Sequence, residues 1–434
     1  MEKGKTSHDR VTVAGGKPVR KNLLPLHQAV IGEEEVAAAV SVLKSGNLMG
    51  IHGGQKGAEF ERELSDYFGV SHAVTVNSGT SALHAVLACM GIGPGDEVLV
   101  PPLGFISTAL AVSYQNAVPV YADVDPVHLN ISAESIREKI TPRTKAIIVV
   151  HLWGHPADMD PLIEIARENN LCLIEDCAQA HGAEYKGRKV GSFGDASCFS
   201  LVQTKIITAG GEGGFVLTRD GELAARMREF CNFARSETDL LFWGIGYNYR
   251  MPEIMGAIGS AQLGKLDRFI EKRRKNARYL TLALDGIQGV EMPREATWAK
   301  NVYWMFPLRV NEAVLGISRD QFVSALKSEG IGASSPKLPD HLQQVFTEKI
   351  GYGRTNCPFE CPHHPGSVSY HQGLCPNAEK GASETLWLPG CSPAATELDL
   401  EDVVAAVKNV ASCLRNTKSL SDNHQPERDE TPPS

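Results

Sequence analysis

Lys205 has the most informative surroundings of any residue in this chain. It lies in CFSLVQTKIITAGGEGGFVLT (198–218), between two apolar segments and just before a glycine-rich hairpin. Burial disfavours the charged form of a lysine and lowers its pKa, so a lysine in such a place needs a use. The commonest use is a Schiff base with an aldehyde. A surface lysine with a buried apolar stem is the alternative, and Lys205 alone does not decide between the two.

Two acidic residues, Glu175 and Asp176, follow the apolar run LCLI at 171–174. They come just past the C-terminal end of an expected strand, and wound sheets bind their ligands at that edge. A carboxylate placed there can hold a pyridinium nitrogen protonated, which makes the ring an electron sink. An aspartate that caps a helix beside a core His181 explains the same residues equally well when they are taken alone.

The segment NSGTSALHAVLACMG (77–91) marks the end of a strand and the start of a helix. Gly79, Thr80 and Ser81 open that helix, and a helix N-terminus offers unpaired N–H groups and a partial positive charge to a phosphate. A glycine there also lets an anion approach the backbone. Ordinary capping by Ser and Thr is the alternative explanation of this segment.

A sheet must position these residues. From about residue 70 to 218, short β-branched runs alternate with helical patterns, which predicts a sheet wound with crossover helices. Several of the runs are apolar throughout, as strands covered on both faces are. The expected strands are 73–76, 97–100, 118–121, 146–150, 171–174, 196–200 and 214–218. The fold class is therefore α/β, with seven strands in one sheet.

The rest of the chain predicts a second, smaller domain. Residues 255–284 have the apolar spacing of one long helix, followed by a strand at 302–310 and helices at 318–330 and 398–415. The stretch 335–390 is rich in Pro, Gly, His and Cys and is too long for a simple connection. We expect a polar N-terminal segment at 1–21, a large domain at 22–275, a small α+β domain at 276–415 with an irregular loop at 335–390, and a disordered tail at 416–434.

Composition excludes several classes of function. The formal charge of -8 provides no basic field for nucleic acid. No apolar run approaches the roughly 20 residues that span a bilayer, and the N-terminus MEKGKTSHDR is polar, so we expect no membrane and a cytoplasmic location. The ten cysteines are typical of reduced core residues rather than of a disulfide framework.

Taken together, the motifs resemble those of the DegT/StrS-type sugar aminotransferases, a family that makes amino sugars and aminocyclitols. The resemblance runs in register from about Leu26 to Gly264 and more loosely to Leu414. It rests on GGKPVR (15–20), NSGTSAL, EDCAQAHG, the pair Ser200 and Lys205, GEGG (211–214) and GYNYRMPE (246–253). It implies the aspartate aminotransferase-like fold of fold type I enzymes, which use pyridoxal 5'-phosphate (PLP).

The resemblance also implies roles for single residues. Lys205 forms the Schiff base with PLP and then moves protons, and Asp176 pairs with the pyridine nitrogen; these two are the expected catalytic residues. Phe105 stacks on the cofactor ring, and Gln179 contacts its 3-hydroxyl. The further expected cofactor-binding residues are Gly79, Thr80 and Ser200, which bind the phosphate, and Asn248, which reaches the phosphate of the neighbouring subunit. A homodimer with shared active sites follows.

The implied reaction moves an amino group from glutamate or glutamine to a keto sugar, expected to be nucleotide-linked, or to a keto cyclitol. Two alternatives stay open. The dehydratase branch of the family replaces the cofactor lysine with histidine, so Lys205 favours amino transfer. A non-catalytic PLP-binding regulator is the other alternative, and no DNA-binding module supports it.

The loop 353–379 brings cysteines and histidines close together in the sequence. They are Cys357, Cys361, His363, His364, His371 and Cys375. Such residues could build a tetrahedral zinc site, but their spacing matches no standard finger or ribbon. The alternatives are a loop that packs its thiols under a lid or shapes the acceptor pocket, and we expect no metal.

Overall fold

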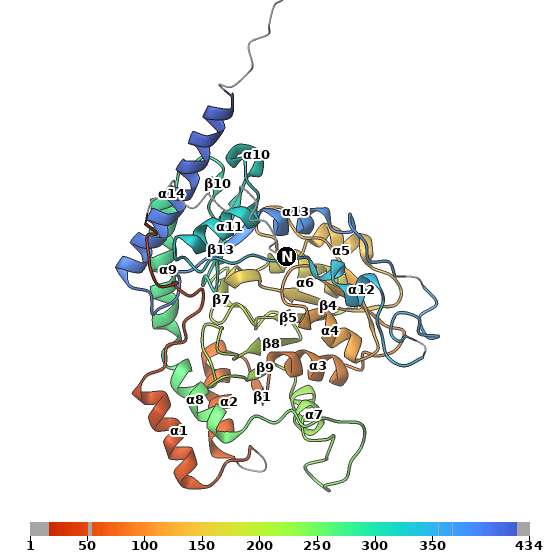
Figure 1. Cartoon of the computed structure of the whole chain (residues 1–434). Coiled ribbons are helices and arrows are strands. Elements are labelled where there is room, and N and C mark those ends of the chain that lie inside the picture. Colours follow the sequence, from red (N-terminus) through yellow and green to blue (C-terminus); the bar gives the residue numbers. More distant parts are fainter. Residues whose placement is uncertain (1–16, 51–53, 355, 367, 423–434) are drawn as a thin grey trace, which may run out of the picture.

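A computed structural model describes residues 17–50, 54–354, 356–366 and 368–422 (Figure 1). Its main sheet consists of β1 (His72–Val76), β2 (Glu97–Val100), β3 (Val118–Tyr121), β4 (Thr144–Val150), β5 (Cys172–Asp176), β8 (Ala196–Ser200) and β9 (Gly214–Thr218). The strand order is β1-β9-β8-β5-β4-β2-β3, and only β9 runs antiparallel to its neighbours. All seven predicted strands, and the α/β class, are confirmed.

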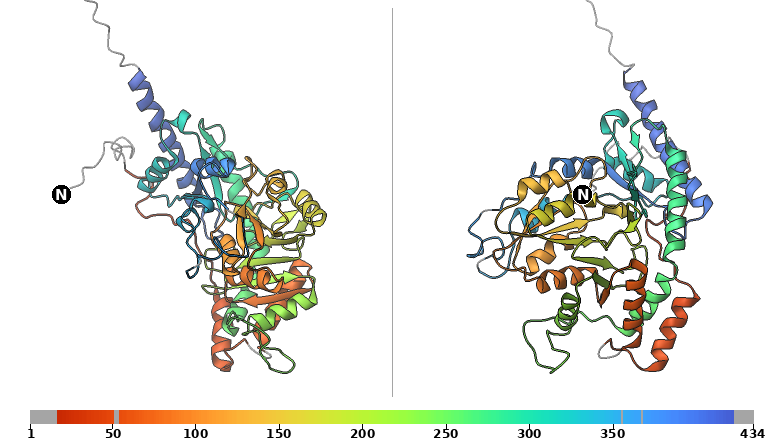
Figure 2. Two further views of the ribbon diagram at one scale, coloured as in Figure 1. Left: turned by 90° about the vertical axis from the view of Figure 1, so that its right-hand side faces the viewer. Right: turned by 180° about the vertical axis from the view of Figure 1, so that it is seen from behind.

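Helices cover both faces of this sheet, which explains its apolar strands (Figure 2). One core cluster joins the sheet to α3 (Gly79–Cys89), α4 (Ser107–Tyr114) and α7 (Gly221–Phe230). The other joins it to α2 (Gln55–Phe68), α5 (Ala133–Lys139), α6 (Met159–Glu168) and the start of α9 (Leu266–Leu284). Because helices cover both faces of the sheet, side chains of the sheet can reach solvent only at the ends of the strands.

A second sheet has its own core. It consists of β10 (Val290–Glu291), β12 (Phe306–Val310) and β13 (Thr385–Leu388), all antiparallel. The second half of α9, α11 (Arg319–Ser328) and α14 (Glu397–Asp422) pack on it. The N-terminal segment joins this unit, because Leu24 lies in its core and Arg20 pairs with Asp399 and Asp402 of α14. The domain boundary at 275 stays a prediction.

Smaller elements complete the chain. A three-stranded sheet of β11 (Ala299–Lys300), β6 (Glu184–Tyr185) and β7 (Arg188–Lys189) ties the segment after β5 to the segment before β12. The remaining helices are α1 (Glu33–Ser45), α8 (Glu253–Leu263), α10 (Glu312–Leu315), α12 (Gln344–Thr347) and α13 (Pro376–Glu384). Short 3₁₀ turns lie at Leu152–Gly154 and Asp340–Leu342.

The prediction of one helix over 255–284 is wrong, because α8 and α9 are separate. Helix α8 ends at Leu263 and α9 starts at Leu266, with a two-residue turn at Gly264 and Lys265 between them. The ammonium group of Lys265 binds Glu34 and Glu35 at the start of α1, at 2.9 and 2.8 Å. These ion pairs hold the turn between α8 and α9 against the start of α1.

The strand predicted at 302–310 begins only at Phe306. Tyr303 has φ +49°, which an extended strand excludes, and its carbonyl accepts a hydrogen bond from Arg273 of α9 at 3.1 Å. The residues before Phe306 therefore form a loop, and this loop reaches the site described below.

The stretch 335–390, predicted to be irregular, contains α12, α13 and the edge strand β13, so that prediction is corrected. Helix α14 continues to Asp422, and residues 423–434 lie outside the described part of the chain. The disordered tail at 416–434 stays a prediction. Residues 1–16 of the predicted N-terminal segment lie outside the described part too.

None of the helices in the described part of the chain is both long enough and apolar enough to cross a bilayer.

Candidate active site

The turn from β1 into α3 brings three chain segments into contact. Ser78 caps the helix, and its side-chain oxygen accepts the N–H of Ser81 at 3.1 Å. A Cβ added to Gly79 would lie 2.7 Å from Cβ of Ser200, at the end of β8. A Cβ on Gly214 would lie 2.7 Å from the nitrogen of Gly79. Only small residues allow this packing, which places the first turn of α3 beside Ser200.

Thr80 belongs to this first turn as well, and the three residues expected at the phosphate thus lie together. A helix N-terminus next to a serine hydroxyl supplies backbone N–H groups, a hydroxyl donor and a favourable dipole to a phosphate. This end of the sheet therefore fits a phosphorylated ligand.

Asp176 is the last residue of β5, and only 5% of its surface is exposed. Its carboxylate accepts the hydroxyl of Thr108 at 2.7 Å and the N–H of Ala178 at 3.1 Å. Thr108 stands in α4, three residues after Phe105, and its N–H bonds the Phe105 carbonyl at 3.0 Å. Phe105 itself is 65% exposed at the mouth of this edge. Sequence reasoning missed Thr108, although it lies in the same PPLGFISTA segment as Phe105.

Gln179 lies three residues beyond Asp176 and is buried. Its side-chain carbonyl accepts the N–H of Trp153 at 2.7 Å. Trp153 has the unfavourable φ of +56°, in the tight turn that follows β4. Because the carbonyl of Gln179 is used to hold this turn, its amide N–H groups are the side that can contact a ligand.

Lys205 lies at the same edge, in the turn after β8. Its Nζ is 4.2 Å from the centroid of the Trp304 ring. Burial lowers the pKa of Lys205 to about 8, against the attraction of Asp176, which raises it. A lysine amine that loses its proton this close to neutral pH is a nucleophile, as the Schiff-base role requires.

Three residues near Lys205 were not found by sequence reasoning. They are His27 of the N-terminal segment, Arg273 of α9 and Trp304 of the loop before β12, and with Lys205 they line one small cavity. The sequence has no motif for such a set, because the three residues come from segments far apart. His181 stays in the core against Phe199 and Phe215, where burial lowers its pKa to about 3 and keeps it neutral.

Asn248 lies beside the turn from β1 into α3 of its own chain. Its carbonyl accepts the side-chain N–H of Asn77 at 3.3 Å, and the next residue, Tyr249, accepts the Asn77 backbone N–H at 2.8 Å. The Asn248 side chain is exposed. The GYNYRM segment thus lies beside the start of α3, and the role of Asn248 toward a second subunit stays a prediction.

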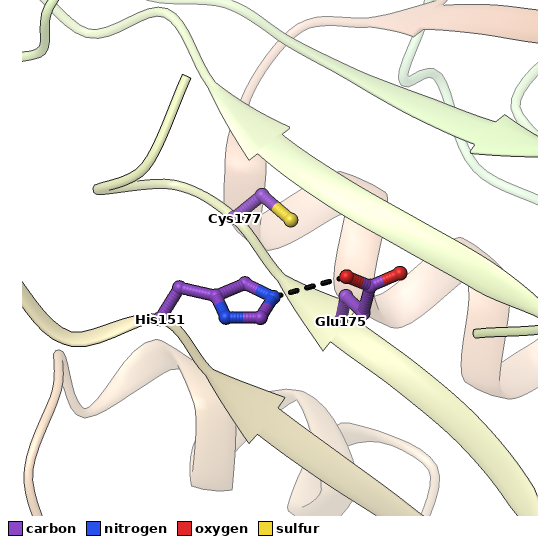
Figure 3. A group of neighbouring side chains, drawn as sticks. All are labelled: His151, Glu175 and Cys177. Carbon is purple, nitrogen blue, oxygen red and sulfur yellow. Dashed lines mark hydrogen bonds and ion pairs between the residues drawn. The ribbon is translucent and has the colours of Figure 1, made fainter. Parts of the chain in front are cut away.

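His151, Glu175 and Cys177, the last two of which flank Asp176 in the chain, form a buried cluster (Figure 3). Among the described residues it is the only set of three such groups close enough to share a metal ion. However, His151 bonds Glu175 at 3.0 Å and accepts the N–H of Ala157 at 3.0 Å, so both its ring nitrogens are used. The cluster is therefore a structural network.

The carboxylate of Glu175 completes that network. It accepts the N–H groups of Gly191, Phe193 and Gly194 at 2.7 to 2.8 Å. Burial would raise the pKa of Glu175, but His151 and these backbone donors outweigh it and hold the pKa low. Glu175 thus anchors the segment after β7 to the end of β5, next to Asp176.

The Cys/His-rich loop packs onto the main sheet at β2 and β3. His364 bonds Glu97 of β2 at 2.9 Å and the Gly366 carbonyl at 3.0 Å, so its ring nitrogens are used. Cys375 and Cys361 are buried, and burial together with Cys361 raises the pKa of Cys357 to about 11. This packing supports the interpretation of the loop as a cover whose thiols point inward.

Comparison with known proteins decides what this site belongs to. Residues 29–408 match the model of the DegT/DnrJ/EryC1/StrS aminotransferase family. The chain belongs to this family. The resemblance that the motifs indicated is confirmed, and so is the fold type I architecture. This member of the DegT/DnrJ/EryC1/StrS family is an aminotransferase, and its cofactor is PLP.

Three relatives show the range of the similarity. GDP-perosamine synthase of Caulobacter vibrioides is 44% identical over 291 residues, which cover 66% of this chain and 78% of that protein. UDP-N-acetyl-3-dehydro-alpha-D-glucosamine 3-aminotransferase of Acidithiobacillus ferrooxidans is 39% identical over 309 residues, 70% of this chain and 80% of the relative. The crystal structure of DesV from S. venezuelae superposes with a TM-score of 0.78 at 34% identity, covering 87% of this chain and 94% of DesV.

The residues present fit PLP. The edge offers a buried, oriented carboxylate at Asp176, a lysine amine with a lowered pKa, and a helix N-terminus beside Ser200. These are the three kinds of group that PLP needs for its ring nitrogen, its aldehyde and its phosphate.

Proposed function

We propose that this aminotransferase moves an amino group from glutamate or glutamine to the keto group of a nucleotide-linked sugar. The observation that carries the proposal is Lys205, whose amine has a pKa of about 8 at the same sheet edge as Asp176. The names of the relatives support the acceptor class, since one is a GDP-sugar enzyme and another a UDP-sugar enzyme. A keto cyclitol is the second acceptor class to test.

We assign the residues as follows. PLP, when bound, supplies an aldehyde that exchanges its oxygen for an amino group and a ring that spreads negative charge. Lys205 binds the aldehyde carbon and moves the proton between substrate atoms, while Asp176 holds a proton on the ring nitrogen. Gly79, Thr80 and Ser200 bind the phosphate. Phe105 packs on the ring, and Gln179 donates to the 3-hydroxyl.

We also propose a cytoplasmic homodimer with shared active sites. The segment before GYNYRM exposes a run of large apolar side chains, which on a monomer would be unusual. They are Phe233, Leu240, Leu241, Phe242, Trp243 and Ile245. Because Asn248 follows directly and is exposed, a second copy that covers this segment would receive Asn248 near its own phosphate site.

Absorbance titration tests the reaction. The purified protein is titrated with L-glutamate and, separately, with L-glutamine, next to the variant Lys205→Ala. We expect the visible band of bound PLP to disappear with one of the donors and to be absent from the variant. The bleached enzyme should then recover its band on addition of a nucleotide-linked keto hexose.

A visible band that no amino donor bleaches would contradict amino transfer and favour the dehydratase or regulator alternatives. Recovery of the band with a keto cyclitol, and not with any nucleotide-linked sugar, would contradict the nucleotide-linked sugar as acceptor. It would leave the proposal of amino transfer intact.

A further inference from the structure

The indole of Trp304 is held in place from three sides. Its ring N–H donates to the carbonyl of Thr204 at 2.7 Å, next to Lys205 in the chain. The ring of His27 stacks on it with a centroid distance of 5.7 Å and an interplanar angle of 26°. Arg273 donates to the carbonyls of Tyr303 and Trp304 at 3.1 and 3.4 Å. The orientation of the indole is therefore set by the N-terminal segment, the turn after β8 and α9.

One face of this fixed ring is turned to the Lys205 amine. The 4.2 Å between Nζ and the ring centroid lies well inside the roughly 6 Å range of a cation–π contact. Among the described residues Lys205 forms no ion pair, and the groups that attract its ammonium are the Trp304 indole face and, through space, Asp176. Such contacts are strongest in desolvated places, and both Lys205 and Trp304 are half-buried.

We propose that the face of Trp304 is the resting position of the Lys205 amine whenever that amine is not joined to the cofactor. Trp304 is then a positioning residue of amino transfer. This inference rests on the proposed function, in which Lys205 is a free amine in alternate half-reactions. A lysine side chain carries about 2 kcal/mol of rotamer entropy. Because the indole face already restricts the rotamers of Lys205, less of this entropy is lost when the amine reaches the reacting carbon.

The charges around Lys205 agree with this role. Asp176 at the end of β5 attracts the ammonium. The indole face lies 4.2 Å from it. Two histidines face it, His181 after β5 and His27 from the N-terminal segment. Burial lowers their pKa values to about 3 and about 4, so both are neutral. The one further cation that acts on these histidines is Arg273, which is bonded to backbone carbonyls.

The test measures the proton affinity of Lys205 directly. The full chain is saturated with pyridoxamine phosphate, which has no aldehyde to bind Lys205. Acylation of Lys205 by acetic anhydride is then followed over a pH series by peptide mass spectrometry, since only the neutral amine reacts. Trp304→Leu removes the π face and Trp304→Phe keeps a smaller one. Trp298→Leu is the matched control, because Trp298 is also half-buried but packs on His155 and Tyr185.

We expect Trp304→Leu to lower the pKa of Lys205 by about one unit and Trp304→Phe to lower it by less. Trp298→Leu should leave it unchanged. An unchanged pKa in a folded Trp304→Leu protein overturns the proposal and makes Trp304 a packing residue. If that variant does not fold, an unchanged or raised pKa in Trp304→Phe overturns it equally. If PLP attaches to another lysine, the proposed function fails. The labelling still measures the effect of the Trp304 indole on the pKa of Lys205.

Discussion

The two sides of the active site differ in how they are built. The cofactor side, from β1 to β9, consists of short motifs at strand ends, and each places its residues through local geometry. The opposite side, formed by His27, Arg273 and the loop before β12, is held by contacts between segments far apart, such as Arg273 with Tyr303 and Trp304. The first kind of construction can be recognised in a sequence, whereas the second appears only in the folded chain.

The largest expected effect of a single change on the cofactor side, short of losing the lysine, comes from Asp176→Asn. An amide cannot hold a proton on the ring nitrogen, so we expect kcat to fall by ~10²–10³-fold, the range seen when one electrostatic stabiliser is lost. Stopped-flow measurement of the glutamate half-reaction checks it. Because Thr108 would still bond an amide oxygen, the fold should survive, and a variant with parent kcat would break the assignment of Asp176.

The titration of Lys205 should show in stability. Its pKa is about 8 in the folded protein and 10.5 for an ordinary exposed lysine, so between these pH values the unfolded chain binds more protons. For the cofactor-free protein, the free energy of unfolding therefore rises from pH 8 to pH 10.5, by up to about 3 kcal/mol. The comparison with Lys205→Met isolates this rise, since the variant lacks it. Parallel pH curves for the two proteins would mean that Lys205 is not desolvated.

Gly79→Val tests the packing of Gly79 against Ser200, where we propose that the phosphate binds. A Cβ there meets Ser200 at 2.7 Å, so we expect a loss of about 1–3 kcal/mol in the free energy of unfolding, together with weaker PLP binding. Urea denaturation and PLP titration measure the two effects. Gly93→Val is the control, because its Cβ would meet only one atom, at 3.9 Å. Equal losses in both variants would show that the packing against Ser200 is not special.

Arg273→Gln probes the opposite side and is expected to have the smallest effect. Loss of its bonds to two carbonyls should cost about 1–2 kcal/mol of stability, while the PLP affinity stays near that of the parent. Urea denaturation with and without PLP checks both statements. A large fall in PLP affinity would remove the distinction between the two sides.

The same difference between local motifs and contacts of distant segments separates what the sequence predicts from what it does not. Strand β8 and the turn at Gly79 were predictable, because apolar runs and helix starts are local signals. The break between α8 and α9 was not, since Glu34 and Glu35, which bind Lys265 of the turn, lie far from it in the sequence. Trp304 was assigned to a strand, since nothing near it in the sequence shows that Arg273 holds the preceding residue at φ +49°.

Borohydride reduction of the holoenzyme tests the role of Lys205. Reduction makes a Schiff base between a lysine and PLP permanent, and peptide mass spectrometry then locates the phosphopyridoxyl group. We predict that the group is found on Lys205, in the peptide between Arg188 and Arg219. Its presence on another lysine, or an unmodified Lys205 in protein with the visible band of PLP, would contradict the account.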